Sequence, residues 1–417
     1  MKKEVFIRNR KKLMNKMEDN SITVFFSGRA PKKTGDENYQ FTPNRNFYYF
    51  TGINEENIIL LMKKSNNISE ELLFIKEIDE EKERWIGKSI RESEASDISG
   101  IKNIKKLTDF PNEINKYILS LNNVNIYFEL DRTEYNDIQS IEESFAYEIR
   151  KKYPQVIVKN IIPYIIPLRL VKSQEEVNNI QKAIDITVDG IKNIMVNSKA
   201  GMKEYEFEAY FEFTCRSKGI KDYAFKTIAA AGKNATVLHY VDNNCVAEDG
   251  DLILFDLGAQ YNYYNGDISR TFPVNGVFTE RQKEVYSSVL QVNKKVIDSI
   301  KPGIKFREIN EKAKKWIAEE CIKLGLIKDE SQVSKYYWHS IGHSLGLDTH
   351  DLDYPDRNVE FKEGMVWTVE PGIYIEEESI GIRIEDVVLV KNNGVEVLTK
   401  GIIKEIDEIE EFMKRRG

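Results

Sequence analysis

The sequence has few of the features that mark a secreted, disulfide-bonded or membrane-spanning protein. Its 417 residues include only three cysteines, and the wide spacing of Cys215, Cys245 and Cys321 predicts buried thiols in a reducing compartment. No apolar run approaches the roughly 20 residues that cross a bilayer. The charged N-terminus lacks the apolar stretch of a secretory signal. These absences predict a soluble, cytoplasmic protein that does not interact with a membrane.

An excess of positive charge is also missing. The chain has 61 Lys and Arg residues against 68 Asp and Glu residues, which gives a net charge of −7. No nucleic-acid partner is expected, because such binding needs a basic surface to displace counterions from phosphates. Hydrophobic residues make up 41% of the chain, enough for ordinary globular cores. At roughly 100–200 residues per domain, the length predicts about two to four domains.

Residues 1–165 are expected to form a mixed α/β domain. The charged opening stretch to Met17 places apolar side chains on one helical face. Pro163 and Pro167 interrupt the apolar segment 161–170, which predicts an extended crossing into the next domain. Four short apolar runs are typical of strands, namely Ile22–Phe26, Ile58–Met62, Leu72–Ile75 and Val124–Phe128.

Residues 166–417 are expected to form a second, α+β domain. Ser173 with Glu176, and Thr279 with Gln282, are capping boxes that predict two helix starts. A second helix and then strands follow each of them, so the order of elements predicts two similar helix–helix–strand halves. The second helices are expected at Tyr205–Ser217 and Phe306–Leu324, and the strands at Asp251–Gly258, Asp267–Val274, Met365–Glu370, Gly372–Ile375 and Ile382–Val390.

Two carboxylates in the first half stand out. Asp256 lies in an apolar strand, on the same face as Leu252 and Leu254. Asp267 begins the returning strand, directly after Gly266, where an exposed turn residue would be an ordinary explanation. Two carboxylates on adjacent strands repel one another unless a proton or a cation compensates.

Two more carboxylates lie in the second half. Glu370 ends an apolar strand, and Glu385 shares a strand face with Arg383 at a spacing of two residues. A solvated Arg/Glu ladder would explain the second segment taken alone. That explanation weakens because three other apolar strands end in or contain a single carboxylate.

Histidine is scarce, and its placement is informative. The chain has four histidines: His239, His339, His343 and His350. The last three fall in one glycine-punctuated segment, where Gly342 and Gly346 disfavour a helix. A loop that presents three imidazoles is better explained as the wall of a site than as core packing.

Four carboxylates and one imidazole form a ligand set with a formal charge near −4. Two divalent cations about 3.5–4 Å apart, bridged by a solvent oxygen, would neutralise it. An oxygen-rich set with one nitrogen suits Mn²⁺ best, with Co²⁺ or Zn²⁺ as alternatives. Such a pair activates water and polarises a carbonyl, which predicts amide hydrolysis.

These motifs resemble the Xaa-Pro aminopeptidases (aminopeptidase P), pita-bread metallopeptidases related to prolidase and methionine aminopeptidase. The resemblance covers the second domain in order, and the segment 39–52 is similar to the creatinase-type N-terminal domain of that family. It implies a pita-bread domain at 166–417 behind a smaller domain at 1–165. The motifs that carry it are residues 254–259, 267–272, 339–351, 368–374 and 381–386.

The resemblance implies a metal ligand for each of five residues. Asp256 would bind one metal ion, His343 and Glu370 would bind the other, and Asp267 and Glu385 would bridge the two. The nucleophile would be a hydroxide shared by both ions.

The resemblance also implies roles around the metals. Glu370 would carry a proton to the leaving proline nitrogen. His239, His339 and His350 would face the substrate and steady the tetrahedral intermediate, and Arg383 would hold the carboxylates and the proline side of the cleft.

Further out, the resemblance implies that Tyr374 lines the proline pocket. It implies that Trp85 reaches the active site of a neighbouring subunit in a homodimer or homotetramer. The substrates would be peptides with proline in second position.

Two alternatives stay open. A prolidase would have the same metal centre with activity confined to dipeptides. Non-catalytic pita-bread proteins and creatinase share the architecture but typically lose the five-ligand set, which is complete in this sequence.

Overall fold

The computed structural model describes residues 1–121 and 123–415. The chain divides into two compact units, Met1–Leu168 and a second unit that begins at Arg169. The sequence places this boundary between residues 165 and 166.

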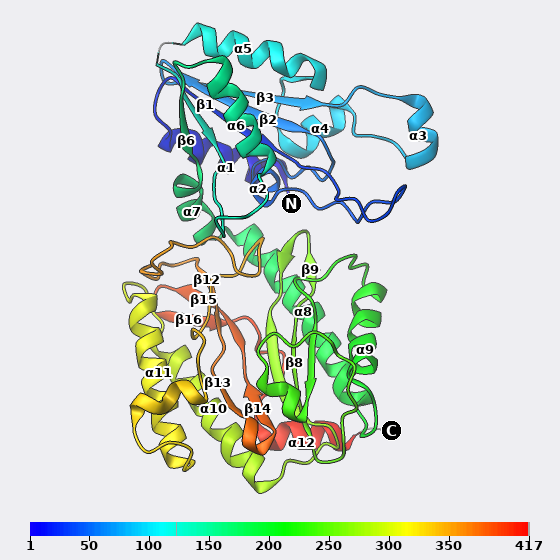
Figure 1. The fold of residues 1–417 in the computed structure, drawn as a ribbon, viewed down its shortest axis with the longest axis vertical. Helices are drawn as coiled ribbons and strands as arrows, with labels where there is room; N and C mark the ends of the chain where they lie inside the picture. The colour runs from blue at the N-terminus through cyan, green and yellow to red at the C-terminus, as the bar shows by residue number, and fades with distance from the viewer. Residues whose placement is uncertain (122, 416–417) are drawn as a thin grey trace. The chain divides into compact units, whose positions relative to one another are not determined.

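The first unit is built on a six-stranded mixed sheet with the order β4-β3-β2-β1-β5-β6 (Figure 1). β1 pairs antiparallel with β2 and parallel with β5. The four predicted strands in this unit are confirmed. The strands are β1 (Ser21–Phe26), β2 (Ile59–Ser65), β3 (Ile68–Ile75), β4 (Ile104–Lys106), β5 (Asn125–Phe128) and β6 (Ile157–Asn160).

Helices cover both faces of this sheet. Ile22 and Val24 point to the face covered by α5 and α6, since alternate strand residues share a side. Phe25 points to the other face, where its ring centroid lies 4.9 Å from that of Phe50. The helices are α1 (Lys3–Lys16), α2 (Arg45–Thr51), α3 (Glu80–Ile86), α4 (Glu92–Ser99), α5 (Phe110–Ser120), α6 (Ile141–Lys152) and α7 (Ile162–Leu170).

The prediction of an extended crossing over residues 161–170 is wrong, because the structure forms α7 there. Pro163 lies in the first turn, where a helix needs no backbone N–H. Pro167 removes one internal hydrogen bond, but the helix buries Ile162, Ile165 and other apolar side chains. Burial of this kind outweighs the local preference of proline.

The second unit repeats a helix–helix–strand order, as predicted. Its first half has the sheet β11-β8-β7 and a small hairpin of β9 and β10. The capping box of Ser173 and Glu176 starts α8. The elements are α8 (Gln174–Asn197), α9 (Glu204–Ser217), β7 (Ile228–Ala231), β8 (Leu252–Leu257), β9 (Gln260–Tyr261), β10 (Tyr264–Asn265) and β11 (Ile268–Pro273).

The second half begins at the capping box of Thr279 and Gln282. Figure 1 shows the strands of both halves between the two helix pairs. The elements are α10 (Glu280–Ser299), α11 (Phe306–Lys323), β12 (Val366–Val369), β13 (Gly372–Ile375), β14 (Ile380–Arg383), β15 (Asp386–Lys391), β16 (Gly394–Val397) and α12 (Ile406–Lys414).

The predicted single strand over 382–390 is wrong, since it is two strands. β14 pairs with β13 and ends at Arg383, whereas β15 pairs with β12 and begins at Asp386. The opposing chain breaks at Glu370 and Pro371, because proline cannot donate to a ladder. Glu370 and Glu385 therefore lie between two ladders.

Candidate metal centre

The hairpin of β8 and β11 brings the first two carboxylates together. Asp256 of β8 stands opposite Ser269 of β11, and Asp267 directly precedes that strand. The two chains approach so closely that a Cβ at Gly258 would lie 1.9 Å from the Gly266 carbonyl oxygen. Glycine is required at this crossing, and it places Asp267, only 3% exposed, beside Asp256.

A loop bonded to β12 holds His343 against Glu370. The His343 N–H donates to Thr368 Oγ1 at 3.0 Å, and Thr368 Oγ1 donates to Glu370 Oε1 at 3.3 Å. The Glu370 N–H donates to the Ile341 carbonyl at 2.9 Å. A Cβ at Gly342 would lie 2.0 Å from the Thr368 carbonyl oxygen, so the loop needs glycine at this point.

Ser269 links Glu385 to Arg383. Its hydroxyl donates to Glu385 Oε2 at 2.8 Å and accepts from Arg383 Nε at 2.7 Å. Arg383 Nη2 forms an ion pair with Asp256 Oδ2 at 2.7 Å. Arg383 and Glu385, which the sequence places on one strand face, thus both bond Ser269 of the first half.

The carboxylates repel one another in this arrangement. Burial and the neighbouring Asp256 and Glu370 charges raise the pKa of Asp267. Burial and the Asp267 and Glu370 charges likewise raise the pKa of Glu385. Burial also raises the pKa of Glu370, against the opposing effects of His343 and Arg383. A nearby cation would relieve this repulsion.

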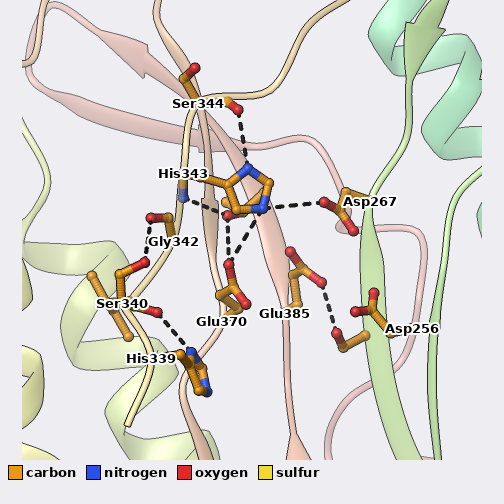
Figure 2. A network of polar contacts seen from close by, with 12 residues as sticks. Asp256, Asp267, His339, Ser340, Gly342, His343, Ser344, Glu370 and Glu385 are labelled. Atoms are coloured by element: carbon orange, nitrogen blue, oxygen red, sulfur yellow. Dashed lines mark hydrogen bonds and ion pairs between the residues drawn. The ribbon is translucent and has the colours of Figure 1, made fainter. Parts of the chain in front are cut away.

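The hydrogen bonds of His343 leave one ring nitrogen facing the carboxylates. Its Nδ1 lies 3.1 Å from the Ser344 carbonyl oxygen, which can only accept, so Nδ1 carries the proton in the neutral ring. Its Nε2 lies 3.4 Å from Asp267 Oδ2 and 3.5 Å from Glu370 Oε1 (Figure 2). A lone pair that faces carboxylate oxygens is the arrangement of a metal-binding imidazole.

The residues present fit a metal centre on two observations. One ligand atom each from Asp267, His343 and Glu385 lie within 4.8 Å of one another. Asp256 Oδ1 is buried and has no hydrogen-bond partner in the described part of the chain. Carboxylate oxygens with one imidazole nitrogen suit harder divalent ions.

His339 is connected differently from His343. Its Nδ1 donates to the Ser340 carbonyl at 2.8 Å, and its Nε2 lies 2.9 Å from the Tyr374 hydroxyl. Arg383 Nη1 donates to that same hydroxyl at 3.2 Å, so the tyrosine O–H donates to His339 Nε2. Burial and the Arg383 charge lower the pKa of His339 to about 4, which keeps the ring neutral.

The other predicted site residues lie in different surroundings. The ring centroid of His350 lies 4.2 Å from that of His343, and burial together with His343 and His239 lowers its pKa to about 4. His239 is exposed on the loop before β8. Trp85 belongs to α3 of the first unit, where its side chain is 84% exposed.

Sequence reasoning missed the groups that hold the ligands in place. Ser269 and Thr368 bridge the site through their hydroxyls, yet each lies in an apolar strand where hydroxyl residues are ordinary. Ser269 stands two residues after Asp267, the one signal that could have identified it.

A buried set of carboxylates around one imidazole, on a duplicated α+β domain, defines a metal-dependent hydrolase. The chain belongs to metallopeptidase family M24, whose family model matches residues 178–392. The model of the aminopeptidase P N-terminal domain matches residues 6–127.

Known proteins resemble the chain along its whole length. The Xaa-Pro aminopeptidase of Escherichia coli is 31% identical, over 99% of this chain and 98% of that protein. Xaa-Pro aminopeptidase 3 of Dictyostelium discoideum is 34% identical, over 100% of this chain and 84% of that protein.

Solved structures agree. A Bacillus anthracis structure assigned to aminopeptidase P is 48% identical with a TM-score of 0.97, covering 100% of this chain and 99% of the other. The zinc-substituted E. coli aminopeptidase P in complex with product has a TM-score of 0.91 at 29% identity, with 100% and 99% coverage. The predicted α+β pita-bread architecture is confirmed.

No helix within residues 1–121 and 123–415 has the length and apolar character to cross a membrane.

Proposed function

We propose that this protein is a metal-dependent Xaa-Pro aminopeptidase, which hydrolyses the bond between an N-terminal residue and a following proline. The observation that carries this proposal is the convergence of Asp256, Asp267, His343, Glu370 and Glu385 in one cluster, in which Asp267 and Glu385 are buried and the other three are partly exposed. The similarity to Xaa-Pro aminopeptidases over the whole chain supports this proposal over a prolidase.

We assign the ligands as the sequence suggests. Asp256 would hold one ion, His343 and Glu370 would hold the other, and Asp267 and Glu385 would be shared by both. The metal pair, most simply Mn²⁺, supplies an activated water and polarises the scissile carbonyl when bound.

The chain's own residues then move the proton and orient the peptide. Glu370 accepts a proton from the attacking water and delivers it to the proline nitrogen, as a carboxylate placed beside the nucleophile can do. The peptide N-terminus is placed by Asp256. Arg383 binds Asp256 Oδ2, which sets the orientation of the Asp256 carboxylate.

The substrate side of the site is assigned to the remaining residues. Tyr374, His339 and Arg383 form one bonded set at the proline side, and His239 and His350 face the peptide backbone. The exposed Trp85 is assigned to a contact with a neighbouring subunit, in a cytoplasmic homodimer or homotetramer.

Substitution of a ligand tests the metal assignment. Asp256→Ala and Glu385→Ala should each abolish turnover and lower the metal content measured by elemental analysis, since each removes a carboxylate that no neighbour replaces. An unchanged rate in either variant would remove the assignment.

Peptide length tests the choice between the two activities. Gly-Pro and Gly-Pro-Ala should be compared by the release of glycine. We expect the tripeptide to be cleaved efficiently, whereas activity confined to Gly-Pro would establish a prolidase instead.

A further inference from the structure

A buried amide lies behind the two carboxylates that sit between the strand ladders. Asn293 of α10 is fully buried, and its Nδ2 donates to the Val369 carbonyl at 3.3 Å and to the Ile384 carbonyl at 3.2 Å. These carbonyls belong to the residues that directly precede Glu370 and Glu385. One side chain thus joins the two ligand-bearing segments.

Between the two strand ladders, the Ile384 N–H donates to the Pro371 carbonyl at 3.2 Å. The β12–β15 ladder ends at the pair of Val369 with Asp386, and the β13–β14 ladder begins at the pair of Gly372 with Arg383. Both ligand residues fall in the gap between the two ladders. Asn293 spans that gap from a helix of 20 residues.

The orientation of the amide is set by a cation. Lys404 Nζ donates to Asn293 Oδ1 at 2.9 Å, and because an ammonium group only donates, the oxygen must face Lys404 and the nitrogen must face the carbonyls. Lys404 is itself anchored by Asp386 Oδ2 at 2.6 Å, and Asp386 Oδ1 accepts from Arg270 Nη2 at 2.8 Å.

The same network reaches Glu385 from a second side. Arg270 Nη1 donates to the Glu385 carbonyl and, at 2.9 Å, to the Ser269 carbonyl. Ser269 is the residue whose hydroxyl donates to the Glu385 side chain. The network therefore bonds the backbone carbonyls of both Ile384 and Glu385, through Asn293 and Arg270 respectively.

We propose that Asn293 is a positioning residue, which sets the spacing of Glu370 and Glu385 and thereby the affinity of the site for its metal ions. This inference rests on the metal centre of the proposed function. A role confined to stability predicts a different result, because it would weaken the fold without a selective effect on metal binding.

The test is a titration of metal-free protein with Mn²⁺ alone, in which electron paramagnetic resonance measures the free ion. Asn293→Leu keeps the side-chain volume and removes the amide, and we expect Mn²⁺ affinity to fall about tenfold, as for other groups that orient metal ligands. The matched control is Asn179→Leu, a buried amide of α8 that bonds the Glu175 carbonyl and Asn262. Its Mn²⁺ affinity should stay within about twofold of the wild type.

A second pair of variants covers the case in which Asn293→Leu does not fold. Lys404→Met leaves the amide without its orienting cation, and we expect about a threefold loss of Mn²⁺ affinity. The control is Lys294→Met, which removes a half-exposed lysine from α10, the helix that carries Asn293. Kinetics on Gly-Pro-Ala should show a lower kcat with KM changed less than about twofold in the Asn293 and Lys404 variants.

Wild-type Mn²⁺ affinity in a folded Asn293→Leu protein, or a loss no greater than in the control, would overturn the inference. Wild-type affinity in Lys404→Met would do so where Asn293→Leu does not fold. The proposed function fails separately, if the wild-type protein binds Mn²⁺ but shows no preference for proline.

Discussion

His339 and His343 present the same ring edge to the backbone and different edges to the site. In both residues Nδ1 faces the carbonyl of the next residue. Nε2 of His343 faces carboxylate oxygens, whereas Nε2 of His339 accepts the Tyr374 hydroxyl proton. The first nitrogen is available to a cation and the second is already occupied.

Replacement of each ring should therefore separate metal binding from the rest of the site. His343→Ala should lower the content of divalent metal, because it removes the nitrogen ligand. His339→Ala should retain the metal of the wild type, because its ring does not face the carboxylates. Elemental analysis of the purified variants measures this, and equal metal loss in both would contradict the distinction.

The sequence singled out the residues of the carboxylate–imidazole cluster but not the groups that hydrogen-bond to them. Asp256 and Glu370 could be identified because a lone carboxylate in an apolar strand is unusual. Ser269 could not be identified, because the importance of its hydroxyl depends on the pairing of strands far apart in sequence.

At the scale of elements, the predictions that rest on local sequence signals are correct. The errors arise where contacts between segments far apart in the sequence decide the structure. The capping boxes at Ser173 and Thr279 start helices as predicted, because the signal is contained in four residues. The helix over Ile162–Leu170 was not predictable from its prolines, since its stability comes from burial of neighbouring side chains. The break between β14 and β15 likewise depends on Pro371 in the opposing chain.

The loop that carries Gly342 and His343 packs so closely on β12 that one added methyl group at Gly342 should disturb it. Gly342→Ala places a Cβ 2.0 Å from the Thr368 carbonyl oxygen, so the loop must move and carry His343 with it. We expect a loss of about 1–3 kcal/mol in unfolding free energy, measured by denaturant titration, together with weaker metal binding. Gly35→Ala is the control, because a Cβ there meets nothing within 4 Å. A Gly342→Ala protein with unchanged stability would contradict this packing.

At the scale of the whole molecule, buried charges couple stability to pH. Asp351 is buried against Arg169 and Lys172, two cations at the start of the second unit. Lys172 Nζ lies 3.1 Å from Asp351 Oδ2. Burial raises the pKa of Asp351, but the two cations outweigh burial and lower it below the ordinary value.

A lowered pKa in the folded state stabilises the protein above the unfolded pKa, about 4, and this stability is lost as the pH falls through the folded value. Asp351→Asn should cost about 3–5 kcal/mol at pH 7, since it breaks a buried ion pair. As the pH falls from about 5 through the folded pKa of Asp351, the variant should also lose less unfolding free energy than the wild type. Parallel pH profiles in urea unfolding would contradict this assignment.

The central claim is that a protein-bound pair of divalent ions performs proline-directed hydrolysis. The most direct measurement is the hydrolysis of Ala-Pro-Ala and Ala-Ala-Ala by protein that has been dialysed against a chelator and then resupplied with Mn²⁺. We expect cleavage of the proline peptide to disappear on chelation and to return with the metal, and Ala-Ala-Ala to be cleaved at least about a hundredfold more slowly. Full activity in protein shown to be free of metal, or equal cleavage of both peptides, would contradict the account.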